Sequence, residues 1–154
     1  MNEADQQTAR APFVGTWHLV SQHSHFPDGR IEPSRGEGAI GVLMYDADGN
    51  VSVQLMRTDA RAAEFTDLRT VETAFEGYLG YFGTYEVDQV AGVVNHRVLG
   101  ASYPAFRGTI QRRQFRFESN GNSLILEAAI PADKTIRVLV WRKNLTPNPS
   151  AASG

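Results

Sequence analysis

The sequence contains no cysteine, and that absence excludes several kinds of chemistry at once. Disulfide frameworks, thiol nucleophiles and thiolate metal sites all need this side chain. No apolar run approaches the ~18 residues that a membrane-spanning helix requires. The 15 basic and 17 acidic residues give a formal net charge of −2, which provides no basic field for nucleic acid. We therefore expect neither a membrane nor a nucleic acid as a partner.

Several motifs are also missing. The sequence has no Gly-rich phosphate loop, no Gly-x-Ser-x-Gly elbow and no dinucleotide-binding fingerprint, so we expect no cofactor. Residues 1–12 are polar and lack the apolar centre of a signal peptide, which makes the cytoplasm the expected location. Oligomeric state stays open between monomer and homodimer.

The length of 154 residues and the apolar fraction of 42% fit one globular domain with a buried core. We expect a disordered leader over residues 1–12, the domain over 13–144, and a disordered tail over 145–154, where Pro, Ser and Ala are frequent.

The domain is rich in short β-segments separated by turn residues. Eight of them can be delimited: 16–23, 40–45, 51–57, 81–88, 93–99, 109–118, 123–130 and 135–143. Successive hairpins favour an all-β, up-and-down antiparallel barrel, and eight strands enclose a lumen that fits one small ligand. Between the third and fourth segments, the spacing of Val71, Ala74, Phe75, Tyr78 and Leu79 predicts a helix that ends at Gly80.

The first and last strands carry the residues that suggest closure. Gly15-Thr16-Trp17 opens the first, and Trp141-Arg142 lies near the end of the last. We expect Trp17 to plug one end of the barrel, with the Arg142 guanidinium stacked across its indole. If Trp17 points inward, alternation also turns His23 inward. The polar segment 24–39 is long for a connection and is expected to form a lid.

These features resemble the bacterial lipocalin-like domains of the calycin group. The resemblance rests on segments 15–21, 45–57, 81–87 and 108–113, together with Asn95-His96, Pro104 and the closing Trp141-Arg142, and it spans residues 13–143. It implies an eight-stranded barrel with a ligand-sized lumen. Barrels of this kind include carriers as well as cofactor-independent isomerases, cyclases and decarboxylases, so the fold leaves the function open.

The segment 109–118 supplies the first candidate site residues. Gln111, Arg113 and Phe115 share one face with Phe117, and a face with two Phe side chains is the better inward candidate. A buried Arg needs a counterpart. Arg113 therefore either contacts a ligand or is held by Glu86 or by backbone carbonyls.

His96 and two tyrosines form the second candidate group. His96 lies on the same face as Val94 and Val98, and it serves either as an acid–base group or as a barrel histidine bonded to Tyr85 or Gln111. Tyr81 and Tyr85 share a face with Gly83. Their hydroxyls either donate to a ligand carbonyl or enolate, with Gly83 leaving room for the ligand, or lie at the rim of the core.

Two further residues complete the candidate ligand contacts. Gln54 lies on a face that the apolar pattern assigns neither to the inside nor to the outside, and His23 faces inward if Trp17 does. His23, His25 and His96 have spacing compatible with a metal site, but solvated histidines explain the pattern better, so no metal is expected.

Two functions from different classes remain. The first is binding of a small apolar or aromatic molecule with a carbonyl, phenol or carboxylate head. The second is a cofactor-independent isomerase, cyclase or dehydratase in which His96 transfers the proton while Tyr85 and Arg113 hold the oxyanion.

Overall fold

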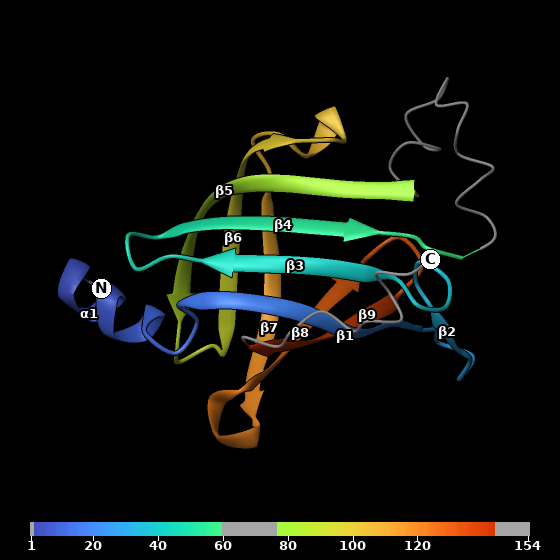
Figure 1. Ribbon diagram of the computed structural model, residues 1–154, viewed down its shortest axis with the longest axis horizontal. Helices are drawn as coiled ribbons and strands as arrows, with labels where there is room; N and C mark the ends of the chain where they lie inside the picture. Colours follow the sequence, from blue (N-terminus) through green and yellow to red (C-terminus); the bar gives the residue numbers. More distant parts are fainter. Residues whose placement is uncertain (1, 60–76, 144–154) are drawn as a thin grey trace.

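The computed structural model describes residues 2–59 and 77–143. Eight strands form a closed antiparallel barrel in which each pairs with the next and β1 pairs with β9 (Figure 1). They are β1 (Gly15–His25), β3 (Ile40–Tyr45), β4 (Asn50–Met56), β5 (Tyr78–Asp88), β6 (Val93–Ala101), β7 (Ile110–Glu118), β8 (Ser123–Ile130) and β9 (Thr135–Lys143). The predicted eight-stranded up-and-down barrel is confirmed.

Alternation of apolar and polar residues explains which strand faces turn inward. In β4, Val51, Val53 and Leu55 are buried, while the residues between them lie on the outer face. In β5, Tyr81, Tyr85 and Val87 are buried, while Phe82, Thr84 and Glu86 between them are exposed. The inward side chains form one continuous core.

One end of the barrel is closed by residues that precede the first strand. Helix α1 (Glu3–Arg10) lies at this end (left in Figure 1), and the Phe13 ring that follows it is fully buried. The Phe13 centroid lies 4.9 Å from those of Phe115 and Phe117 and 5.4 Å from that of Tyr45. Phe13 therefore fills the closed end of the lumen.

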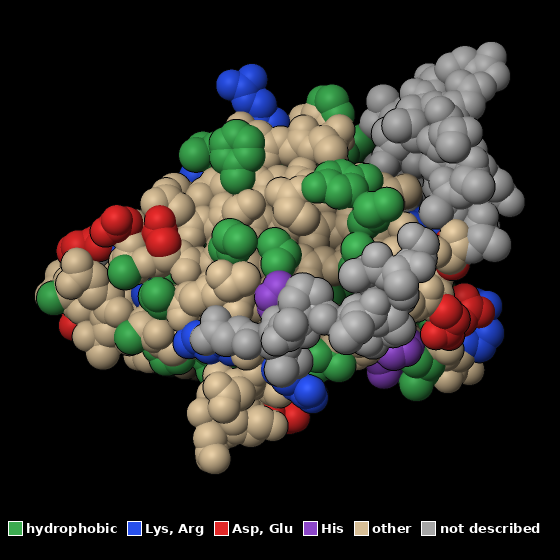
Figure 2. Space-filling model, in the orientation of Figure 1, with side chains coloured by type: hydrophobic (Ala, Val, Ile, Leu, Met, Phe, Trp, Pro, Cys, Tyr) green, Lys and Arg blue, Asp and Glu red, His purple; other side chains and the backbone are tan. Residues whose placement is uncertain are grey.

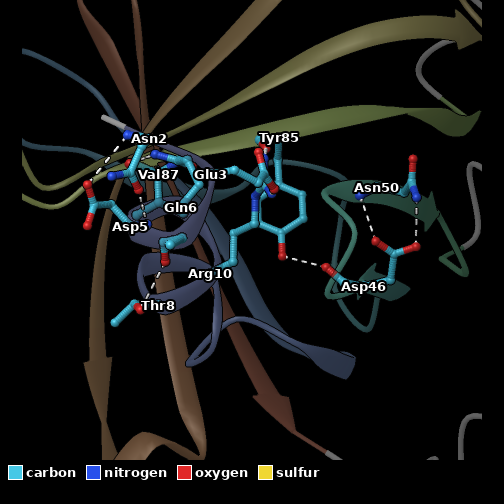
Figure 3. A network of polar contacts seen from close by, with 11 residues as sticks. Asn2, Glu3, Asp5, Gln6, Thr8, Arg10, Asp46, Asn50, Tyr85 and Val87 are labelled. Carbon is cyan, nitrogen blue, oxygen red and sulfur yellow. Dashed lines mark hydrogen bonds and ion pairs between the residues drawn. The ribbon is translucent and has the colours of Figure 1, made fainter.

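Helix α1 corrects the prediction of a disordered leader over residues 1–12. Asn2 and Asp5 form a reciprocal capping box at its start. The Gln6 side chain bonds both the N–H and the C=O of Val87 at the barrel edge, and Arg10 donates to the Tyr85 carbonyl (Figure 3). These tertiary contacts order a segment whose own composition is polar.

The plug at this end differs from the predicted one in its cation. Trp17 is fully buried, and its indole N–H donates to the Phe13 carbonyl at 2.8 Å. Lys143, not Arg142, lies over the indole, with its ammonium 5.3 Å from the ring centroid. Alternation explains the correction: Trp141 and Lys143 share the inner face of β9, so Arg142 points outward and is exposed.

A bulge in β1 changes the inward face partway along the strand. The register with β9 shifts between Leu19 and Ser21, and beyond that point Gln22 and Ser24 are buried. A one-residue shift moves every later side chain to the other face. The prediction that His23 points inward is therefore wrong.

The segment predicted to be a lid loop is partly a hairpin. Ser24 and His25 belong to β1, and β2 (Ile31–Pro33) pairs with them at the end of the barrel opposite α1, called the mouth below (Figure 1). The Ser24 and Ser34 hydroxyls lie 2.8 Å apart, and the Gln22 amide donates to the Gly36 carbonyl. Arg35, in the turn that follows, is buried.

The predicted helix between strands three and four lies mainly in residues 60–76, outside the described part of the chain. Its last three residues, Tyr78 to Gly80, belong to β5 instead. Two short 3₁₀ turns, η2 (Pro104–Phe106) and η3 (Ser119–Gly121), join later strands. Gly83 lies at a register shift between β5 and β6, where a Cβ atom would lie 1.8 Å from the Arg97 carbonyl oxygen. It therefore accommodates backbone rather than a ligand.

The outer surface carries separate apolar side chains over β3, β4 and β5 (Figure 2). Met44, Met56, Tyr78 and Phe82 are among them. Exposed apolar side chains are common on soluble folds and by themselves mark no site. No helix in residues 2–59 and 77–143 is long and apolar enough to cross a membrane.

Candidate ligand-binding site

A cavity of about 410 Å³ occupies the lumen between the closed end and the mouth. Its apolar wall includes Leu43, Val53, Leu79, Leu126 and Leu139, and its polar lining includes Tyr81, His96, Gln111 and Arg113. The volume lies in the range of small-molecule sites, which are mostly apolar with a few polar groups that orient the ligand. Four of the eight predicted ligand contacts thus line one cavity.

His96 is the centre of the polar lining. It is 1% exposed, and each ring nitrogen has a tyrosine partner: the Tyr45 hydroxyl lies 2.7 Å from Nε2, and the Tyr81 hydroxyl 2.7 Å from Nδ1. The predicted hydrogen-bond partners of His96 were Tyr85 and Gln111, and neither of them bonds its ring. Tyr45, which shares an inward face with Leu43, was not among the predicted site residues.

Burial determines the protonation states of this trio. Burial, helped by the positive charge of Arg113, lowers the pKa of His96 to about 3. Burial also raises the pKa of both Tyr45 and Tyr81 above the usual value. At neutral pH the imidazole is therefore uncharged and both phenols keep their protons.

The hydrogen-bond directions follow from this state. A neutral imidazole donates from one nitrogen and accepts at the other. Within the described residues each tyrosine hydroxyl bonds only His96, but Tyr81 lines the cavity and Tyr45 does not, so we assign the Tyr45 proton to Nε2, the one acceptor within its reach. Nδ1–H then donates to the Tyr81 oxygen. The Tyr81 proton is left for another acceptor, and Tyr81 lines the cavity.

Gln111 and Arg113 lie beside this trio on β7. The Arg113 guanidinium donates to the Arg112 carbonyl at 3.0 Å and to the Gln111 side-chain oxygen at 3.4 Å. Glu86, the predicted structural counterpart, is exposed on the outer face of β5. Both of these partners are neutral acceptors, so the charge of Arg113 is not matched by a carboxylate among the described residues.

Three further lining residues were not identified from the sequence. Arg137 and Trp141 lie on the inner face of β9, and Arg35 reaches the cavity from the turn after β2. Arg137 Nε and Trp141 Nε1 are buried without a hydrogen-bond partner in the described part of the chain. The alternation that turns Trp141 inward also turns Arg137 inward, so this signal was present in the sequence.

The other four predicted contacts lie elsewhere. Gln54 is on the outer face of β4, where it bonds the Tyr78 hydroxyl. Tyr85 and Phe115 pack around Phe13 at the closed end, and the Tyr85 hydroxyl donates to the Asp46 carbonyl at 2.7 Å. His23 faces outward beyond the β1 bulge. Burial raises the pKa of Tyr85 to about 12, so its proton stays in that structural bond.

The histidines do not gather into a metal site. Within residues 2–59 and 77–143, no three His, Asp or Glu side chains lie close enough together to hold a metal ion. His96, with a tyrosine on each ring nitrogen, does not form a group with His23 and His25.

A closed barrel of eight antiparallel strands around a ligand-sized cavity defines a class of small-molecule-binding architecture. The lipocalin-like domain family matches residues 14–144, and the chain belongs to this family. A comparison with curated proteins finds no match.

Several solved structures are similar to the barrel at low sequence identity. A de novo designed fluorescence-activating β-barrel has 13% identity and a TM-score of 0.45, with 88% of this chain and 97% of that chain covered. The amine-binding protein of Rhodnius prolixus, in its tryptamine complex, has 12% identity and a TM-score of 0.43 over 91% and 67% of the two chains. A mutant of the fluorescent protein UnaG has 10% identity and a TM-score of 0.43 over 88% and 99%.

Proposed function

We propose that this protein binds a small, mainly apolar molecule in the barrel lumen, oriented by a polar head that accepts hydrogen bonds. A carbonyl, a phenol or a carboxylate oxygen has the required chemistry. The observation that carries the proposal is the Tyr45–His96–Tyr81 chain, because it leaves one hydroxyl proton for an acceptor inside an otherwise apolar cavity. A buried donor without a partner is costly, and a ligand acceptor offsets that cost.

Rigid placement of this donor supports binding. The Tyr81 oxygen is held by His96, whose orientation is in turn held by Tyr45, so the direction of the remaining proton is restricted before a ligand arrives. Preorganised donors lose little conformational freedom on binding. The buried Trp141 indole N–H, at the same cavity wall, is a second donor without a partner in the described residues.

The geometry supports binding better than the acid–base alternative. With a pKa of about 3, His96 carries no proton to give as an imidazolium at neutral pH, and both ring nitrogens are engaged. Tyr85, which that mechanism assigns to the oxyanion, directs its hydroxyl to Asp46 at the closed end. The proposed catalytic trio of His96, Tyr85 and Arg113 therefore does not converge on one point of the cavity.

A neutral fluorescent ketone tests the proposed donor directly. The emission of 6-propionyl-2-dimethylaminonaphthalene shifts to longer wavelength when its carbonyl accepts a hydrogen bond. We expect saturable 1:1 binding, a shift to shorter wavelength in Tyr81→Phe, and an affinity loss of roughly 2- to 10-fold, the value of a neutral hydrogen bond. Tyr78→Phe, an exposed tyrosine on the same strand, is the matched control and should bind like the wild type. Absence of saturable binding to the wild type would contradict the proposal.

A further inference from the structure

Two arginines face the lumen from strands on either side of β8. Arg113 lies on β7 and Arg137 on β9, and both line the cavity. Arg137 pairs with Ala128, while the last pair between β7 and β8 is Gln114 with Glu127. Arg113 and Ala128 are the next residues of the two strands beyond this last pair. Arg113, Ala128 and Arg137 thus line the same part of the chain's cavity where the β7–β8 ladder has ended.

The strands that carry these positions separate at this point. Residues 110–113 of β7 pair only with β6, and residues 128–130 of β8 pair only with β9. The cavity is lined by Ala128, Ala129 and Ile130 along that separation. It therefore extends from the centre of the barrel to a lateral gap between β7 and β8, near the mouth.

The charged side chains that line the cavity, among the residues the structure describes, are all arginines. No Asp or Glu lines the cavity in the described ranges, and Arg113 bonds only neutral oxygens there. Arg35 lines the same cavity, and burial together with the positive charges of Arg137 and Arg57 lowers its pKa to about 10. Asp133 is close enough to Arg137 to feel its charge, but it is exposed and bonds the Thr135 N–H. Cations gathered in a partly buried site repel one another, and an anionic partner relieves that cost.

We infer that the ligand is an organic anion whose oxyanion group binds between Arg113 and Arg137, with its apolar body against Leu43, Val53 and Trp141. This inference rests on the proposed function and adds the charge of the ligand to it. A guanidinium presents a planar fork of N–H donors that matches carboxylate, sulfonate and phosphate oxygens. Ala128, which pairs with Arg137, contributes only a methyl group to the cavity wall.

Two fluorescent probes that differ by one sulfonate group test this inference. 1-Anilinonaphthalene-8-sulfonate and N-phenyl-1-naphthylamine share one apolar body, and only the first carries a sulfonate. We expect the wild type to bind the sulfonate at least about 10-fold more tightly. Arg113→Gln and Arg137→Gln should each weaken it about 10- to 100-fold, the value of a charged hydrogen bond, and change the neutral probe less than about 3-fold.

Matched controls separate a local effect from net charge. Arg112→Gln and Arg142→Gln make the same change at exposed positions on the same two strands, and both should keep the preference for the sulfonate. Added salt should weaken only the anionic probe in the wild type, a measurement that needs no variant to fold. Competition by dodecanoate, dodecyl sulfate and dodecyl phosphate identifies the preferred oxyanion, and dodecanol should compete least.

The outcomes are distinct. If the neutral probe binds as tightly as the sulfonate, or if dodecanol competes as well as the anions, the inference is wrong while binding in the lumen stands. The same holds if Arg113→Gln and Arg137→Gln weaken both probes equally. If neither probe binds in a saturable way, the proposed function fails and the inference fails with it.

Discussion

At the scale of single residues, burial keeps the His96 imidazole neutral and holds it in one orientation between two tyrosines. Each ring nitrogen is 2.7 Å from a tyrosine oxygen, and the ring is excluded from water. Protonation would turn both nitrogens into donors and break the bond that Tyr45 donates. The Tyr45–His96–Tyr81 chain therefore requires the neutral ring.

This requirement makes stability depend on pH. The pKa of His96 is about 3 in the fold, against an ordinary value of 6.5, so between these values the unfolded chain binds a proton that the folded chain excludes. The free energy of unfolding should therefore fall as pH drops below 6.5, by on the order of 1 kcal/mol per pH unit from this group. This pH dependence can be measured by urea unfolding of the wild type and His96→Gln between pH 7 and about pH 5, a range in which carboxylates stay ionised. Equal slopes for the two proteins would contradict a neutral buried ring.

Residue roles could be predicted where a strand is regular. Gln111 and Arg113 were found because β7 alternates without interruption, and Arg137 could have been found in the same way from Trp141. His23 could not, because the bulge after Leu19 depends on how β1 meets β9, and no local signal marks it. The partners of His96 depend on strands that meet only after the barrel closes.

At the scale of elements, α1 and Phe13 act as a plug for the closed end. Phe13 is 0% exposed and contacts rings from β3, β5 and β7. Phe13→Ala should lower the free energy of unfolding by about 3–5 kcal/mol, the range for deleting a large buried aromatic side chain. Gln6→Ala removes the edge bonds to Val87 and should cost about 1 kcal/mol. Equal, small losses in urea unfolding would show that the plug is not part of the core.

The first and last strands meet at Trp17, and the cation that lies over its indole ring is the Lys143 ammonium. Lys143→Gln should cost about 0.5–1 kcal/mol, as expected for a partly exposed cation–π contact. Arg142→Gln, the adjacent and exposed position, should cost nothing measurable. In a double-mutant cycle, Trp17→Ala and Lys143→Gln should be non-additive, whereas Trp17→Ala and Arg142→Gln should add. The reverse pattern would restore the sequence-based assignment.

The strands were predictable as elements, but α1 was not. Turn residues such as those of the Asp46–Asn50 hairpin, with Gly49 at a φ of +95°, separate the apolar segments and fix their number. Helix α1 is eight residues long and mostly polar, too short to be stable alone. Its order comes from Gln6 and Arg10 contacting β5, which the sequence pattern does not reveal.

At the scale of the whole molecule, the barrel has one filled end and one strand ladder that stops short of the mouth. Phe13 and α1 fill the first end, while the β7–β8 ladder stops at Gln114, and the cavity lining continues past that point to Ala128. The cavity lies between the filled end and the end of this ladder, and its lining combines apolar walls with fixed hydrogen-bond donors. Ligand access is expected through the gap, where no strand has to unpair.

Filling this cavity from inside is the most direct test that the lumen is the binding site. Ala128 is 6% exposed and lines the cavity, so Ala128→Phe places a ring in the space a ligand would occupy. Fluorescence titration with N-phenyl-1-naphthylamine should give one site in the wild type and at least about 10-fold weaker binding in Ala128→Phe. Val90→Phe adds the same bulk at a residue that is 99% exposed and should bind like the wild type. Equal affinity in all three proteins, each shown to be folded, would contradict binding in the lumen.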